Sequence, residues 1–255
     1  MKKPLIKVQK EEIAPNENNN SRRHFLKMGS LAVVGTSLFL SCSDDDDFAG
    51  PTPPDAVFDL GAGNLGILNY AYALEQLEAD FYTRAVAGTY YTGLAEDSEE
   101  KQIIRDAWYH EVIHREFFKA AISDVAPNDI LPELEFDYGS LDFNNRDAVL
   151  STALLLEDTG VSAYNGAGKL IDVTAPLGDV YLLLAGKIVS VEARHAAAFA
   201  DLINPGTTAF ARDGILVDLG GTGLSYDKAL PPSEILAAAG GFITTEFTAT
   251  QLPTS

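Results

Sequence analysis

Four long segments with helical periodicity dominate this sequence. Apolar residues recur three and four positions apart over residues 64–86, 98–125, 146–171 and a fourth segment that follows Pro176 and ends near Ile203. Such spacing lines one face of an α-helix. Short turns connect the helices within each pair, whereas about 20 residues rich in Asp, Asn and Pro connect the two pairs, enough to span a helix of about 37 Å. The pattern therefore predicts an all-α fold, a four-helix bundle with one long crossover.

Outside this predicted bundle, which we place at residues 61–205, the chain divides into three further segments. Residues 1–41 have the features of an export signal, residues 42–60 form an acidic, Pro-rich tether, and residues 206–255 form a Gly-rich C-terminal extension. One short helix is predicted in the extension, at residues 232–239. We expect the extension to pack over one end of the bundle.

The N-terminal segment indicates where the protein goes. The sequence SRRHFLK at residues 21–27 resembles the twin-arginine export motif and leads into an apolar run over residues 28–41, which is too short to span a bilayer. The run ends at Cys42, in a setting that resembles a bacterial lipoprotein processing site, although Phe39 stands where a small aliphatic residue is usual. We expect export to the periplasm or outer membrane with a lipid anchor on Cys42. Cleavage nearby, which would give a soluble periplasmic protein, is the alternative.

Charge and cysteine content narrow the classes of function. Cys42 is the only cysteine, so disulfides within the chain and thiolate metal clusters are excluded, and any metal must bind oxygen and nitrogen ligands. Residues 42–255 hold 11 Lys and Arg against 34 Asp and Glu, a net charge of −23. Such a surface repels phosphates and anionic headgroups. This excludes a nucleic-acid partner and limits membrane contact to a lipid anchor.

Two Glu-x-x-His pairs mark the second and fourth predicted helices. Glu111 and His114 form the first pair, and Glu192 and His195 form the second. Residues three apart lie on one helix face, so each pair presents a carboxylate and an imidazole to the same point. Only three His follow the export signal, and the chance that two of them carry Glu three residues upstream is on the order of one in a hundred. The third, His110, points about 100° away from Glu111, and we expect it at the surface or supporting a ligand.

The first and third predicted helices complete the pattern. Each has a Glu followed by a Tyr seven residues later, two turns along one face: Glu75 with Tyr82, and Glu157 with Tyr164. The repeated order of Glu and then Glu-x-x-His indicates an internal duplication. Glu78 lies one turn from Glu75 and is the alternative to it, but we favour Glu75 because the third helix has a glycine where Glu78 would have its counterpart. The two Tyr are either hydrogen-bond partners of the carboxylates or plain core residues.

This set resembles the ligand set of the ferritin-like superfamily. With the export signal, the chain is similar to bacterial ferritin-like domain proteins related to desiccation-associated proteins. The resemblance implies two metal ions, iron favoured over manganese, bound by Glu75, Glu111, His114, Glu157, Glu192 and His195. In that arrangement Glu111 and Glu192 bridge the two ions, with Glu75 and His114 on one side and Glu157 and His195 on the other. Four carboxylates balance two divalent cations, and without the cations they repel one another.

Two classes of function follow from this resemblance. The first is a redox-active di-iron or di-manganese oxidoreductase that reacts with dioxygen or hydrogen peroxide, as a ferroxidase, peroxidase or catalase would. The second is a non-enzymatic metal-binding or stress-protective envelope lipoprotein. Iron storage in a closed shell is disfavoured, because an acyl chain on every subunit would hinder a soluble cage. Metal ions and small oxidants are the expected partners, and a homodimer stays open.

Overall fold

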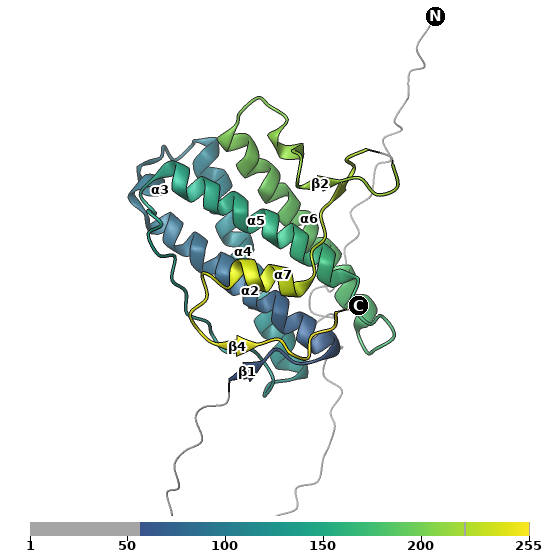
Figure 1. The fold of residues 1–255 in the computed structure, drawn as a ribbon. Helices are drawn as coiled ribbons and strands as arrows, with labels where there is room; N and C mark the ends of the chain where they lie inside the picture. Colours follow the sequence, from purple (N-terminus) through teal and green to yellow (C-terminus); the bar gives the residue numbers. More distant parts are fainter. Residues whose placement is uncertain (1–56, 222, 255) are drawn as a thin grey trace, which may run out of the picture. The chain divides into compact units, whose positions relative to one another are not determined.

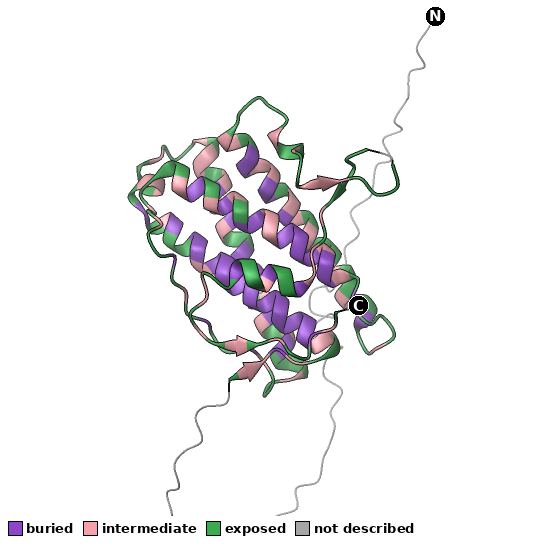
Figure 2. Ribbon diagram, in the orientation of Figure 1, coloured by how far each residue is buried: buried purple, intermediate pink, exposed green. Residues whose placement is uncertain are grey.

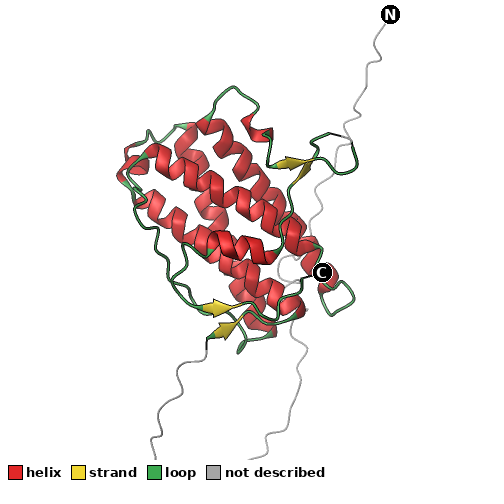
Figure 3. Ribbon diagram, in the orientation of Figure 1, coloured by secondary structure: helices red, strands yellow, loops and turns green. Residues whose placement is uncertain are grey.

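The computed structural model describes residues 57–221 and 223–254. The predicted export signal, Cys42 and most of the tether lie outside the described residues. Four long helices form a bundle: α2 (Gly63–Ala87), α4 (Glu99–Val125), α5 (Arg146–Gly168) and α6 (Gly178–Ile203) (Figure 1). α2 packs along α4 and α5 packs along α6, and the two pairs meet where α2 contacts α5 and α4 contacts α6. The predicted all-α bundle with one long crossover is confirmed (Figure 3).

Polar side chains cap the N-termini of α4 and α5. α4 begins after Ser98, whose hydroxyl accepts a hydrogen bond from the backbone amide of Lys101 (3.3 Å). α5 begins after Asn145, whose side-chain oxygen accepts from the backbone amide of Ala148 (3.0 Å). These caps satisfy amides that the first turn of a helix leaves without partners. The residues at each boundary therefore determine where both helices begin.

Two helix boundaries differ from the prediction. α5 ends at Gly168 rather than at residue 171, and the backbone amide of Leu170 turns back to the carbonyl of Ala167 (2.9 Å). The break predicted between the first two helices contains a one-turn helix, α3 (Thr89–Gly93). A short turn can hold such a piece without lengthening the connection, so the order of the bundle helices is unaffected.

The crossover between α4 and α5 is held against α2 by two buried amides. Asn69 donates to the carbonyl of Asp129 (2.8 Å) and accepts from the backbone amide of Leu131 (2.9 Å). Gln76, two turns along α2, makes an equivalent pair of contacts with the crossover backbone (3.2 and 2.8 Å). Each side-chain amide supplies the partners that an irregular backbone segment lacks. The crossover thereby covers one side of α2, which is buried over most of its length (Figure 2).

The C-terminal extension does not pack over one end of the bundle, as the sequence suggested, but runs along α5. Its helix α7 (Pro232–Ala239) packs on α5 (Figure 1). Just before α7, the backbone amide of Leu230 donates to the carbonyl of Ser162 (3.0 Å). Gly166 permits this approach, since a Cβ there would collide with the carbonyl of Leu230. The extension therefore covers part of the side of the bundle formed by α5.

Short strands complete the described part of the chain. β1 (Phe58–Asp59) pairs in parallel with β4 (Phe247–Thr248) and joins the two ends of the described chain. The 3₁₀-helix η1 (Ala209–Ala211) leads to β2 (Leu216–Val217), which pairs antiparallel with β3 (Tyr226–Asp227). Among the described residues, no helix has both the length and the apolar character needed to cross a bilayer.

Candidate metal centre

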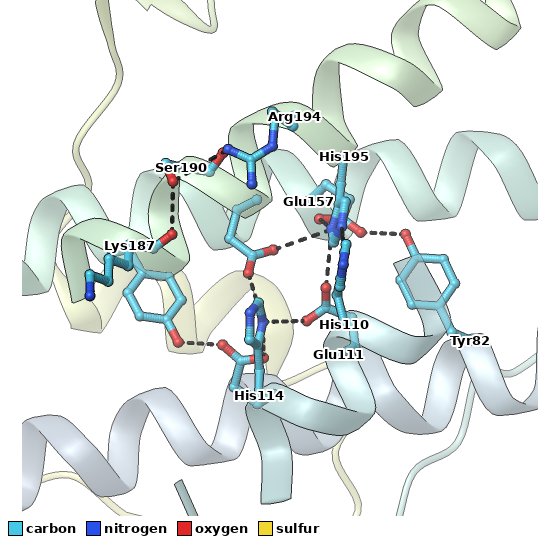
Figure 4. Close-up of polar contacts among 12 residues, drawn as sticks. Tyr82, His110, Glu111, His114, Glu157, Lys187, Ser190, Arg194 and His195 are labelled. Carbon is cyan, nitrogen blue, oxygen red and sulfur yellow. Dashed lines mark hydrogen bonds and ion pairs between the residues drawn. The ribbon is translucent and has the colours of Figure 1, made fainter. Parts of the chain in front are cut away.

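A cluster of carboxylates and imidazoles occupies the interior of the bundle. The structure brings together all six residues predicted as ligands: Glu75 from α2, Glu111 and His114 from α4, Glu157 from α5, and Glu192 and His195 from α6. The four carboxylates are 0% exposed, and the two imidazoles are 9% and 8% exposed. Figure 4 shows the cluster between the helices. Four glutamates buried together without solvent indicate a site for positive charge.

The first half of the cluster surrounds His114. Its Nδ1 lies 3.2 Å from Oε2 of Glu111, 3.1 Å from Oε1 of Glu192 and 3.3 Å from Oε2 of Glu75. Three helices thus direct carboxylate oxygens to the same imidazole nitrogen. The i, i+3 spacing of Glu111 and His114 places both side chains on the inner face of α4.

The second half surrounds His195 in the same way. Its Nδ1 lies 3.1 Å from Oε1 of Glu111, 3.1 Å from Oε2 of Glu157 and 3.9 Å from Oε2 of Glu192. Two four-residue groups result, in each of which the ligand atoms lie within 4.8 Å of one another: Glu75, Glu111, His114 and Glu192 in one, and Glu111, Glu157, Glu192 and His195 in the other. Glu111 and Glu192 belong to both groups. This is the arrangement that two adjacent cations with shared carboxylates require.

Two buried tyrosines connect α2 and α5 across the cluster. The Tyr82 hydroxyl on α2 donates to Oε1 of Glu157 on α5, and the Tyr164 hydroxyl on α5 donates to Oε1 of Glu75 on α2. Of the two alternatives for these tyrosines, the structure shows hydrogen-bond partners of the carboxylates. Burial, reinforced by the adjacent carboxylate, raises the pKa of each phenol well above its ordinary value. Both hydroxyls therefore remain donors at neutral pH.

Burial and mutual repulsion hold protons in the cluster when no metal is bound. Burial is the main reason that the pKa of Glu75 rises to about 7 and that of Glu192 to about 8, with neighbouring carboxylates adding to the effect. Burial alone would lower the pKa of His195, but the nearby carboxylates of Glu157 and Glu111 outweigh it and raise that pKa to about 11. The pKa of His114 is raised for the same reasons by Glu111, Glu192 and Glu75. Positive charge is therefore strongly favoured at this place.

The donor set fits divalent cations. Four carboxylate oxygens in the cluster accept no well-directed hydrogen bond from the described residues, although an imidazole nitrogen lies 3.1–3.9 Å from each: Oε2 of Glu75, Oε1 of Glu111, and both oxygens of Glu192. Native proteins rarely leave buried acceptors unpaired, so each such oxygen needs a partner of another kind. No Lys or Arg in the described part of the chain forms an ion pair with these carboxylates. Carboxylate and imidazole donors without thiolates suit iron and manganese.

Glu78 and His110 also belong to the surroundings of the cluster. The sequence posed Glu78 as the alternative to Glu75, but the structure buries both, and Glu78 is 3% exposed. Only Glu75 falls within a four-residue ligand group. His110 is exposed on α4, and its Nδ1 lies 2.8 Å from Nε2 of His195. The sequence did place His110 at the surface or beside a ligand, but helical spacing alone gives no signal for a contact with α6.

Comparison with known proteins bears on the same residues. Among curated proteins, none matches the chain significantly. The family described as the ferritin-like domain matches residues 63–205, from the start of α2 to just beyond the end of α6. The match covers more than half of the chain and contains the whole cluster. On the strength of this match and of the bundle that carries it, the chain belongs to the ferritin-like domain family.

Proposed function

We propose that the buried cluster is a dinuclear centre for iron or manganese, with iron favoured, and that the protein reacts with dioxygen or hydrogen peroxide during oxidative or metal stress. The observation that carries this proposal is the pair of four-residue groups that share Glu111 and Glu192. Six side chains supply four formal negative charges, which balance two divalent cations in a medium of low dielectric. Two bound ions would supply one-electron redox chemistry toward a small oxidant.

The residues of the chain have distinct tasks in this proposal. One ion would be held by Glu75 with His114 and the other by Glu157 with His195, while Glu111 and Glu192 belong to both groups and would be shared. The Tyr82 and Tyr164 hydroxyls orient the two outer carboxylates by donating to one oxygen of each, which leaves the other oxygen for the ion. Complete burial of the carboxylates excludes bulk water. It also favours small oxidants over larger substrates.

Anaerobic loading followed by rapid mixing with oxidant tests this proposal. Elemental analysis of protein loaded with Fe(II) should give two ions per chain, and stopped-flow absorbance after mixing with dioxygen or hydrogen peroxide should show oxidation much faster than that of free Fe(II). Two bound ions with no acceleration would instead favour a non-enzymatic metal-binding role. A Glu111→Gln variant is the matched control, since it removes one shared carboxylate with little change in shape. Wild-type protein that binds neither iron nor manganese would refute the proposal.

Export and lipid attachment are also part of the proposal. They are supported by residues 21–27 and by Cys42 after its apolar run, all outside the described residues. Twin-arginine export carries folded proteins, often with a cofactor in place, which is consistent with a metal centre built inside a bundle. Replacing Arg22 and Arg23 by Lys should retain the protein in the cytoplasm, and Cys42→Ala should abolish palmitate labelling. Unchanged export of the Lys variant would count against the twin-arginine route. A wild-type protein that takes up no palmitate label would count against lipid attachment.

A further inference from the structure

Glu78 is a buried carboxylate that does not belong to the six-residue centre. It is 3% exposed, and its Oε2 has no hydrogen-bond partner among the described residues. No Lys, Arg or His of the described chain forms an ion pair with it. Burying a carboxylate without a partner is costly, so the surroundings must offer it either a proton or a cation.

The position of Glu78 follows from the duplication. Tyr82 contacts Glu157 and Tyr164 contacts Glu75, so α2 and α5 run antiparallel and are related by an approximate two-fold axis. Glu78 stands three residues after Glu75 and four before Tyr82, at the middle of this span. The axis therefore passes close to Glu78, between the two halves of the cluster.

Gly160 occupies the matching position on α5 and leaves space for the Glu78 side chain. A Cβ at Gly160 would lie 3.2 Å from Oε1 of Glu78 and 3.6 Å from Oε2 of Glu192. Two glutamates would not fit at the axis. The repeated pattern therefore breaks at this position, with Glu on α2 and Gly on α5. As a result, a single carboxylate lies where the two halves meet.

The electrostatics agree with this position. Burial raises the pKa of Glu78 well above its ordinary value, and the charges of Glu192, Glu111, Glu157 and Glu75 raise it further. These four carboxylates come from both halves of the cluster.

We propose that Glu78 is a seventh metal-binding residue of the centre, and that its carboxylate contacts both cations from the side of α2 and α5. The inference rests on the proposed dinuclear centre and adds to it a third shared carboxylate, after Glu111 and Glu192. With five carboxylates, the protein supplies one more negative charge than two divalent ions carry.

A Glu78→Gln substitution tests this inference, because the amide matches a protonated carboxyl in size but does not bridge two cations as a carboxylate does. Calorimetric titration with Mn(II) under anaerobic conditions should show two ions bound to the wild type. In Glu78→Gln both affinities should fall, that of the weaker ion by about tenfold or more, since even residues that only support metal ligands contribute 10–100-fold. The electron paramagnetic resonance signal of the coupled Mn(II) pair should change as well.

Two further variants make the result decisive. Asp80→Asn removes a half-buried carboxylate from the same helix, one that pairs with Arg84 and lies outside both ligand groups, and should leave both affinities unchanged. Gly160→Ala should weaken Mn(II) binding in the wild-type background by displacing the Glu78 carboxylate, but not in a Glu78→Ala background. Two Mn(II) bound with unchanged affinity and coupling in Glu78→Gln would show a protonated structural carboxyl and overturn the inference alone. A wild type that binds no Mn(II) or Fe(II) would overturn the proposed function as well.

Discussion

His110 stacks on His195 with an interplanar angle of 13° and places its Nδ1 2.8 Å from Nε2 of His195. Nδ1 of His195 faces Glu111 and Glu157 in the interior. When that nitrogen binds a cation, the ring proton must sit on Nε2, and His110 is the group placed to accept it. In the proposed centre, His110 would thus hold His195 in the tautomer that leaves Nδ1 free for metal. His110 directly precedes Glu111, and the residue that directly precedes Glu192 is Val191. His114 therefore has no imidazole partner equivalent to His110, and the two halves of the centre differ.

Replacing His110 should therefore weaken the binding of one ion of the pair. We expect His110→Phe to lose about tenfold or more in affinity for the ion at His195, with the other ion little affected. His110→Asn keeps a hydrogen-bond acceptor near the position of Nδ1 and should restore much of the loss. Calorimetric titration with Mn(II) measures both affinities, and Tyr109→Phe, an exposed neighbour on the same helix, serves as control. Equal loss at both ions would contradict the assigned contact.

Removing either tyrosine hydroxyl should destabilise the metal-free protein. Tyr82→Phe and Tyr164→Phe each leave a buried carboxylate oxygen without its donor, at a cost of about 1–2 kcal/mol in the free energy of unfolding. Tyr70→Phe is the matched control, because the Tyr70 hydroxyl is buried but has no hydrogen-bond partner among the described residues. That change should be neutral or slightly stabilising. Urea denaturation of the three variants at neutral pH, with a chelator present, gives the comparison; equal effects would mean that the contacts with Glu157 and Glu75 add nothing.

Helical spacing was sufficient to predict that each Glu-x-x-His pair lies on one helix face. An i, i+3 pair fixes a shared helix face, so Glu111 with His114 and Glu192 with His195 had to point the same way once both segments were helical. The same rule left Glu75 and Glu78 unresolved, because residues one turn apart share a face. Only the packing of α5, with Gly160 opposite Glu78, shows that both are buried.

The course of the C-terminal extension was not predictable in the same way. Its path depends on single non-local contacts, such as the Leu230 amide bonded to the Ser162 carbonyl next to Gly166. A glycine inside a helix gives no indication of which segment will lie on it. The crossover is similar, since Asn69 and Gln76 are ordinary polar residues in the sequence but hold its backbone against α2. Sequence periodicity predicts the helices and their buried faces, whereas single contacts between distant segments leave no repeating pattern in the sequence.

The stability of the metal-free protein should fall as pH rises from about 5 to 8. Folding raises the pKa of Glu75 from 4.5 to about 7 and that of Glu192 from 4.5 to about 8. Over this window the folded chain keeps protons that the unfolded chain has released, so the free energy of unfolding decreases with pH. His195, whose pKa rises from 6.5 to about 11, acts in the same direction above pH 6.5. Thermal melts in the presence of a chelator measure this slope.

Metal should reverse that trend. Binding replaces the protons of the cluster with cations, so affinity increases as pH rises. The rise in melting temperature on adding Mn(II) should accordingly be larger at pH 8 than at pH 6, because ligand binding stabilises the folded state by mass action. A Glu192→Gln variant should show a flatter pH dependence without metal. Melting temperatures that do not respond to Mn(II) at either pH would place the titrating carboxylates outside a metal site.

The last prediction compares a residue that belongs to one ligand group with a residue that belongs to both. His195 lies only in the group with Glu157, whereas Glu192 lies in both groups. His195→Ala removes one neutral donor and should leave about one ion per chain with little redox turnover. Glu192→Ala removes a charged ligand that belongs to both groups, so the binding of both ions should be weakened and most of the metal should be lost.

Arg194→Ala provides the control for both variants. Arg194 is exposed on the same helix and hydrogen-bonds to Ser190, outside both ligand groups, so its loss should leave two ions bound. Elemental analysis after anaerobic loading and gel filtration measures the content of each variant. Similar content in His195→Ala and Glu192→Ala would mean that Glu192 serves a single ion. Full content in both, with the melting temperature still raised by metal, would move the binding site away from this cluster altogether.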